Sequence, residues 1–279
     1  MIRQTVLFIC LMIFCLSGFA QNAEFPYQLN LKKDLIIGGV SGLSFFSESF
    51  IGSQVHNEQE DYFTLLNKNS INAIDRKAIN NWNLKAENSR ERLGSIGLWG
   101  IGLAGTMTIS MVEGLNGRGT VTSNALTNGV MIVEGGLFVL GLSDLAKAIV
   151  ERPRPFAYNS NLSFETKIES GDYKESFFSG NTAITTYGAF YTAKVINDLY
   201  PNSKWKYVAW GGAGLYSGYA GYLAVKSGHH FPTDVFIGNL VGAGVAILIP
   251  HLHKIKINKK GMSLNVSPSA GGIYASLKF

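Results

Sequence analysis

The sequence predicts an all-α protein, a multi-helix bundle embedded in a membrane, with a short β-hairpin at its C-terminus. Charged residues make up 15% of the 279-residue chain, below the roughly 25% that is usual for soluble domains. The chain also contains 32 glycines, and small residues let helices approach closely in membrane bundles. Long uncharged segments recur along it at lengths that suit buried or spanning helices.

The first twenty residues have the layout of a secretory signal peptide, with Arg3, an apolar core and small residues leading to Ala20. Both cysteines, Cys10 and Cys15, lie inside this segment. If it is removed, the mature chain has no thiol, which excludes disulfides and cysteine catalysis. We therefore predict an exported protein. An uncleaved membrane anchor is the alternative.

Five apolar segments predict the main helices. They are Leu35–Ile51, Gly94–Val112, Ala125–Leu145, Tyr207–Val225 and Val235–Ile249. Gly94–Val112 and Tyr207–Val225 each run nineteen residues without charge, a length that crosses a bilayer. A further helix is expected over Thr182–Leu199, and an amphipathic helix over Ile71–Trp82. Two alternating runs near the end predict the hairpin, Met262–Val266 and Ile273–Phe279. The expected domains are a signal peptide (1–20), a helical domain (21–250) and a basic segment with the hairpin (251–279).

A basic cluster ends the Ala125–Leu145 segment and contains Lys147, Arg152 and Arg154. Positions seven apart lie on nearly the same helix face, so Lys147 and Arg154 are expected to converge, with Pro153 and Pro155 ending the helix. Guanidinium donors match the oxygens of a tetrahedral anion such as phosphate. The alternative is a helix C-terminus whose cations suit its dipole.

A second cluster, Ser179 and Gly180 followed by Asn181, precedes the next helix. Backbone N–H groups at a helix start bind anions, and glycine allows close approach. An ordinary helix N-cap formed by Ser179 or Thr182 is the alternative.

A third cluster, with His230 four residues before Asp234, precedes the last helix. The carboxylate is expected to hold one ring nitrogen and leave the other free to attack phosphorus. A capping Asp beside a structural His is the alternative, and His229 is less favoured because its spacing to Asp234 is one longer. The order of the helices places all three clusters at one end of the bundle.

These clusters resemble the three signatures of the type 2 phosphatidic-acid phosphatase and vanadium haloperoxidase superfamily over roughly residues 70–250. Lys147, Arg154 and Pro155 meet the first signature in full, and His230 with Asp234 meets the end of the third. The resemblance implies a helical bundle of this family's type. It also implies that the third-motif His attacks phosphorus, forming a phosphohistidine, while a second-motif His protonates the leaving alcohol.

Two departures separate the chain from that pattern. Asn181 stands where the family has the second-motif His, and Leu223 with Ala224 stands where the third motif opens with Ser-Arg. Asn donates hydrogen bonds but cannot deliver a proton, and losing a general acid costs roughly 10²- to 10⁴-fold in rate. Lys226 and Arg152 are the candidates to replace the missing guanidinium.

The predicted function is hydrolysis of a phosphate monoester or pyrophosphate, with a lipid phosphate favoured, through a phosphohistidine. The predicted catalytic residues are His230, Asp234 and Asn181, and the predicted phosphate-binding residues are Lys147, Arg152, Arg154, Ser179 and Gly180. The alternative is an impaired family member that binds phosphate-bearing head groups or a partner; a vanadate-dependent haloperoxidase is least favoured. No metal, cofactor or nucleic acid is expected. We predict an inner-membrane location in a bacterial-type cell envelope with a periplasm-facing site, a soluble periplasmic bundle being the alternative.

Overall fold

The computed structural model describes residues 25–51, 60–255, 263–269 and 272–278. The predicted signal peptide, with both cysteines, lies outside these residues. The described chain is mostly helical. The long helices are α2 (Leu31–Ile51), α4 (Leu84–Ser95), the π-helical segment η3 (Ile96–Gly105), α5 (Thr106–Leu115), α6 (Val121–Val150), α8 (Gly180–Leu199), α9 (Trp205–Lys226) and α10 (Pro232–His253). The short ones are α3 (Glu60–Leu65), η1 (Lys68–Ser70), η2 (Arg76–Asn80), η4 (Pro155–Tyr158) and α7 (Phe164–Glu169).

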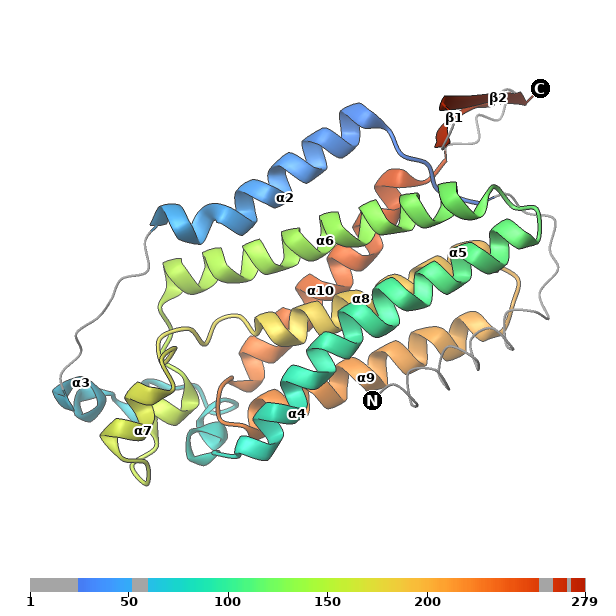
Figure 1. Ribbon diagram of the computed structural model, residues 1–279. Coiled ribbons are helices and arrows are strands. Elements are labelled where there is room, and N and C mark those ends of the chain that lie inside the picture. Colours follow the sequence, from blue (N-terminus) through green and yellow to red (C-terminus); the bar gives the residue numbers. More distant parts are fainter. Residues whose placement is uncertain (1–24, 52–59, 256–262, 270–271, 279) are drawn as a thin grey trace.

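Helix α8 forms the centre of the bundle and packs against α6, α9, α10 and η3. Figure 1 shows these helices running side by side, with α2 lying along the outside of α6. Tyr187 and Tyr191 of α8 are fully buried. The Tyr187 hydroxyl donates to the carbonyl of Met131, 2.9 Å away, and that of Tyr191 lies 2.9 Å from Oδ1 of Asn128. Both hydrogen bonds satisfy phenol groups that burial removes from water, and both tie α8 to α6.

Glycines bring the helices around α8 into backbone contact. A Cβ atom at Gly188 would lie inside contact distance of the Gly97 carbonyl oxygen, so η3 and α8 cross without an intervening side chain. On α10, a Cβ atom at Gly238 would lie 2.7 Å from the carbonyl oxygen of Ser179, at the start of α8. The glycines that are abundant in the sequence therefore determine how closely the neighbouring helices approach α8.

Three helical segments are long and apolar enough to cross a membrane: Leu84–Leu115, Val121–Tyr158 and Pro232–His253. Their exposed side chains include Trp99, Val133 and Phe236, which suits contact with lipid. The chain thus has the composition of a membrane protein. Among the described helices, α2 and α9 are not in this set, although the sequence predicted a spanning length for Tyr207–Val225.

The predicted helix Thr182–Leu199 corresponds to α8, but the amphipathic helix predicted over Ile71–Trp82 is wrong. The Asn72 side chain accepts from the backbone N–H groups of Ile74 and Asp75, both at 3.0 Å, and starts a turn there. Only the short helix η2 follows, while Ile71, Ala78 and Ile79 are buried.

Two C-terminal strands, β1 (Ser263–Ser269) and β2 (Gly272–Lys278), pair antiparallel. The structure describes the backbone of these strands but almost none of their side chains. A folded hairpin at the C-terminus therefore stays a prediction.

We predict that Gly188→Ala lowers the thermal unfolding temperature in detergent, with a loss of about 1–3 kcal/mol from overpacking against backbone. The matched control is Gly214→Ala on α9, where a Cβ atom meets nothing within 4 Å. Alanine there should leave stability unchanged or raise it, because it has the higher helix propensity. Equal melting temperatures for the two variants would contradict the close crossing of η3 and α8.

Candidate functional site

The three polar clusters meet at the end of the bundle where α8 and α10 begin and α6 ends, beside α3 and α7 (Figure 1). Backbone hydrogen bonds join them. The N–H of Ser179 donates to the carbonyl of Asp234 at 3.2 Å, and the N–H of Ser176 donates to the carbonyl of Arg152 at 3.0 Å. Segments far apart in sequence are therefore fixed to one another at this end.

Asp234 is fully buried and lies at the centre of these contacts. Its Oδ2 accepts from the N–H of Phe231 at 2.9 Å and from the hydroxyl of Ser176 at 2.6 Å. Its Oδ1 accepts from the guanidinium of Arg152. The carboxylate caps α10 and at the same time joins that helix to the two other clusters.

Arg152, a predicted phosphate-binding residue, donates from both terminal nitrogens of its guanidinium to protein oxygens. Besides Asp234, it contacts Oδ2 of Asp75 at 2.8 Å, and its guanidinium lies 4.3 Å from the centre of the Phe231 ring. Burial raises the pKa of Asp75, but hydrogen bonds from Thr233 and Arg152 outweigh it and hold that pKa below its usual value. Arg152 is thus placed to neutralise two buried carboxylates.

Arg154 lies in the segment after α6 and not, as was predicted, on the helix. Helix α6 ends at Val150, with Glu151 in the left-handed conformation (φ 44°), so Lys147 and Arg154 do not share a helix face. Arg154 follows in extended backbone and is buried. Its guanidinium bonds Oδ2 of Asp172 at 2.5 Å and lies 3.5 Å from the carbonyl oxygen of His229. The predicted shared face is wrong, but Arg154 does lie beside the histidine loop.

His230 is held by a backbone carbonyl and not by the predicted carboxylate. Its Nδ1 lies 2.8 Å from the carbonyl oxygen of Ser176, whose hydroxyl bonds Asp234. The carbonyl accepts only, so Nδ1 carries the proton and the lone pair is left on Nε2. Burial and the guanidinium groups of Arg154 and Arg90 hold the pKa of His230 well below its usual value. The imidazole is therefore neutral at pH 7.

The loop before His230 is fixed by the segment that follows η2. Gly228 has φ 86°, and a side chain there would collide with the carbonyl of Asn81, so the turn requires glycine. The Asn81 side chain donates to the carbonyl of Val225 at 2.9 Å. His229 stacks on Trp82, with ring centres 5.6 Å apart, and its Nδ1 lies 3.1 Å from Oε2 of Glu87.

Arg90 is a residue near the site that no sequence motif indicates. It lies on α4, is buried, and forms an ion pair with Glu87. Its charge acts on His229, His230 and Arg154. The charge of Arg90 therefore acts on His230, whereas the ammonium of Lys226, one candidate for that role, lies 5.5 Å from the ring centre of Tyr222. No motif signals Arg90, because its proximity arises only when α4 packs against α8 and α9.

Lys147 lies at the edge of the site and is partly exposed. Its ammonium is 3.5 Å from Oδ1 of Asp144 and 3.7 Å from Oε2 of Glu175. Both contacts are longer than a strong charge-assisted hydrogen bond. Because the pairs are long and exposed, a ligand can displace them at small cost.

The second cluster has the geometry of a tightly packed helix start. Ser179 is buried, and its hydroxyl lies 2.7 Å from that of Thr182. A Cβ atom at Gly180 would lie 2.5 Å from the hydroxyl of Ser143, so glycine is also required by packing against α6. A Cβ atom at Gly94 would lie 2.7 Å from Oδ1 of Asn181, which places that amide against α4.

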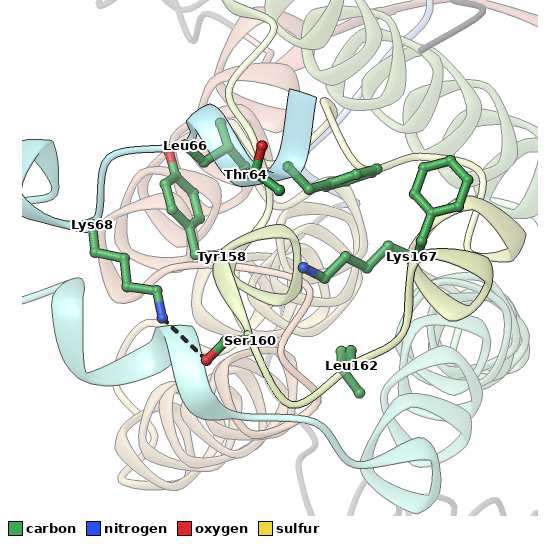
Figure 2. Close-up of a pocket in the computed structure, with 9 residues that line it drawn as sticks. Thr64, Leu66, Lys68, Tyr158, Ser160, Leu162 and Lys167 are labelled. Atoms are coloured by element: carbon green, nitrogen blue, oxygen red, sulfur yellow. Dashed lines mark hydrogen bonds between the residues drawn. The ribbon is translucent and has the colours of Figure 1, made fainter. Parts of the chain in front are cut away.

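A pocket of about 340 Å³ lies next to the site. Its lining residues are Phe63, Thr64, Leu66, Lys68, Tyr158, Ser160, Leu162, Phe164 and Lys167, with no carboxylate among them in the described chain. Figure 2 shows the Lys167 side chain extending across the pocket and Lys68 turned towards Ser160. Tyr158 connects pocket and site, because its ring contacts that of Phe231 with centres 6.3 Å apart. The pocket combines positive charge with apolar walls.

We predict that the site end of the bundle is labile to acid. Burial and the nearby Arg154 lower the pKa of His229 to about 4, so the unfolded chain binds more protons than the folded chain between that pKa and 6.5. The free energy of unfolding therefore falls as pH drops through this range, by up to about 3 kcal/mol from this group. Melting temperatures at pH 7.5, 6 and 5 measure the effect. His229→Gln should flatten the dependence and His251→Gln, on an exposed position, should not; equal slopes in all three proteins would contradict the assignment.

The comparisons with known proteins agree with the motif spacing. Residues 125–257 match the family model of the PAP2 superfamily. Comparison with curated proteins and with solved structures gave no match. The matched stretch contains Lys147, Arg154, His230 and Asp234 and runs from α6 to the end of α10. The family model that matches this part of the chain is that of the family predicted from the spacing of the motifs.

Proposed function

We propose that the protein is a membrane-bound phosphohydrolase that cleaves a phosphate monoester or pyrophosphate, with a lipid phosphate as the favoured substrate, through a phosphohistidine at His230. The observation that carries the proposal is the state of His230. It is a buried, neutral imidazole whose Nδ1 proton is held by the Ser176 carbonyl, so the Nε2 lone pair is available for attack. Family membership supports phosphatase-like chemistry in general.

The reaction would proceed in two displacements. In the first, Nε2 of His230 forms a bond to phosphorus while the bond to the leaving oxygen breaks and the leaving group departs with the electron pair. In the second, water attacks the phosphohistidine, the P–N bond breaks, and phosphate and a proton are released. During the first step the imidazole becomes positively charged, and the Ser176 carbonyl stabilises its Nδ1–H.

Asn181 determines which leaving groups are suitable. An alkoxide needs a proton as it leaves, and an amide side chain cannot supply one. A phosphate or an aryl oxide leaves without that help because its conjugate acid is much stronger. We therefore infer that the site favours pyrophosphates and other esters with acidic leaving groups.

Binding the phosphate requires an exchange of partners at the cations. Lys147 has only long contacts to Asp144 and Glu175, and Asp172, the partner of Arg154, is 37% exposed. An incoming phosphate would take the place of these carboxylates. Arg90 stands in for the guanidinium that Ala224 lacks, and the pocket with Lys68 and Lys167 suits a further anionic or apolar part of the substrate.

A binding protein without turnover is the second candidate function. It is favoured by Asn181 in place of a general acid and by the ion pairs that occupy Arg152 and Arg154. Export of the chain and a periplasmic orientation of the site are part of the proposal. Export depends on the first twenty residues, and the orientation requires that Leu35–Ile51 does not cross the membrane fully.

We predict that purified protein turns over a lipid pyrophosphate and an aryl phosphate faster than phosphatidic acid, and that His230→Asn abolishes all three activities. Asn181→His should raise turnover of phosphatidic acid by roughly 10²-fold, because a general acid is restored, and change the aryl phosphate little. Acid-quench trapping of a ³²P-labelled phosphohistidine in the wild type, absent from His230→Asn, would measure the intermediate. Phosphate binding without turnover of any substrate would favour the second candidate.

We predict that Arg90→Met lowers kcat/KM by roughly 10²- to 10³-fold, because a positive charge that acts on His230 is lost. Losing this positive charge also raises the pKa of His230, so the acid limb of the pH profile should move to higher pH. Arg92→Met, at an exposed position on the same helix, is the matched control. In Arg90→Met the carboxylate of Glu87 loses its partner. The double variant Arg90→Met/Glu87→Gln removes this carboxylate and so separates its effect from that of Arg90. An unchanged acid limb in both Arg90 variants would refute the role of Arg90.

A further inference from the structure

A histidine and two carboxylates from three helices meet away from the site. They are Asp34 at the start of α2, Glu134 in α6 and His253 at the end of α10. Their ligand atoms all lie within 4.8 Å of one another. Nε2 of His253 is 3.1 Å from Oδ1 of Asp34 and 3.3 Å from Oε2 of Glu134. Figure 1 places the start of α2 and the end of α10 at the end of the bundle opposite to α3 and α7.

Backbone groups orient the side chains of His253 and Asp34. Nδ1 of His253 lies 2.9 Å from the carbonyl of Ile249, so that nitrogen carries the proton and Nε2 presents its lone pair to the carboxylates. Oδ2 of Asp34 accepts from the N–H of Asn30 at 2.8 Å, which leaves Oδ1 facing Nε2. Support of this kind for the second nitrogen or oxygen is characteristic of metal ligands.

The environment of Glu134 independently indicates that the cluster binds a cation. It is 5% exposed, and its Oε2 has no hydrogen-bond partner among the described residues. A buried carboxylate in an apolar helix is costly unless it is paired or binds a cation. Lys33, which precedes Asp34 on α2, directs its ammonium to the carbonyl of Leu252 at 3.5 Å. With both carboxylates ionised, the cluster would carry a net negative charge even if His253 were protonated.

We propose that Asp34, Glu134 and His253 bind one Zn²⁺ ion, which joins the start of α2 to α6 and α10. Bonds of about 2.0 Å at tetrahedral angles separate ligand atoms by about 3.3 Å, close to the distances from Nε2 of His253 to the two carboxylates. One imidazole with two carboxylates suits zinc, whereas magnesium and calcium prefer oxygen ligands alone. Water would occupy the fourth position.

The spacing of the ligands explains why no metal site was predicted from the sequence. Asp34, Glu134 and His253 lie about a hundred residues apart and come from separate helices, so no short ligand motif is visible. The proposal is independent of phosphoryl chemistry, because neither His230 nor its neighbours take part. Its consequence is structural, since a ligand that binds only the folded chain stabilises it.

The experiment measures zinc on the full-length protein in detergent, stripped with EDTA, reloaded with one equivalent of ZnCl₂ and desalted. We expect about one zinc per chain by mass spectrometry in the wild type, and less than a tenth of that in His253→Gln and Glu134→Gln. His251→Gln, two residues away and exposed, is the matched control and should retain zinc. Zinc should raise the melting temperature of the wild type and of His251→Gln only.

Two outcomes would overturn the proposal. One is a wild type that retains no more zinc than His253→Gln. The other is a melting temperature that is insensitive to zinc and EDTA but changes with pH, which would identify the cluster as a protonated histidine between two carboxylates. The wild-type zinc content decides the matter even if a variant fails to fold.

Discussion

The buried carboxylate of Asp234 is the constraint on which the site depends. A charge removed from water must be neutralised and must fill its lone pairs with donors. Here the donors come from three places: the Phe231 N–H at the start of α10, the Ser176 hydroxyl before α8, and the Arg152 guanidinium after α6. Satisfying one carboxylate therefore brings together segments that are separated by more than eighty residues.

This arrangement also explains how His230 is held. Because Asp234 is already occupied by Ser176 and Arg152, it does not hold the imidazole, and the carbonyl of Ser176 does so instead. A carbonyl fixes the tautomer as a carboxylate would, but it does not raise the pKa of the ring as a negative charge does. With Arg154 and Arg90 nearby, the ring stays neutral, which is the state a nucleophile needs.

Sequence reasoning predicted the helical class, the three clusters and their meeting at one end of the bundle, because apolar length and motif order carry that information. It did not predict partners within the site. The pairing of Arg152 with Asp75 depends on a turn that Asn72 initiates, and the position of Arg90 depends on how α4 packs. Local propensity says little about contacts of this kind, because they arise only from the tertiary fold.

The ion pairs of Arg152, Lys147 and Arg154 differ in strength, and this difference determines which side chain could exchange its partner for a phosphate. Arg152 neutralises two fully buried carboxylates, and removing one partner of such a pair costs about 3–5 kcal/mol. Lys147 has long contacts and Arg154 has a half-exposed partner in Asp172, so both change partners at lower cost. In the proposed function, a phosphate would therefore displace the carboxylate partners of Lys147 and Arg154 more readily than those of Arg152. Arg152 remains with Asp234 and keeps the loop that presents His230 in place.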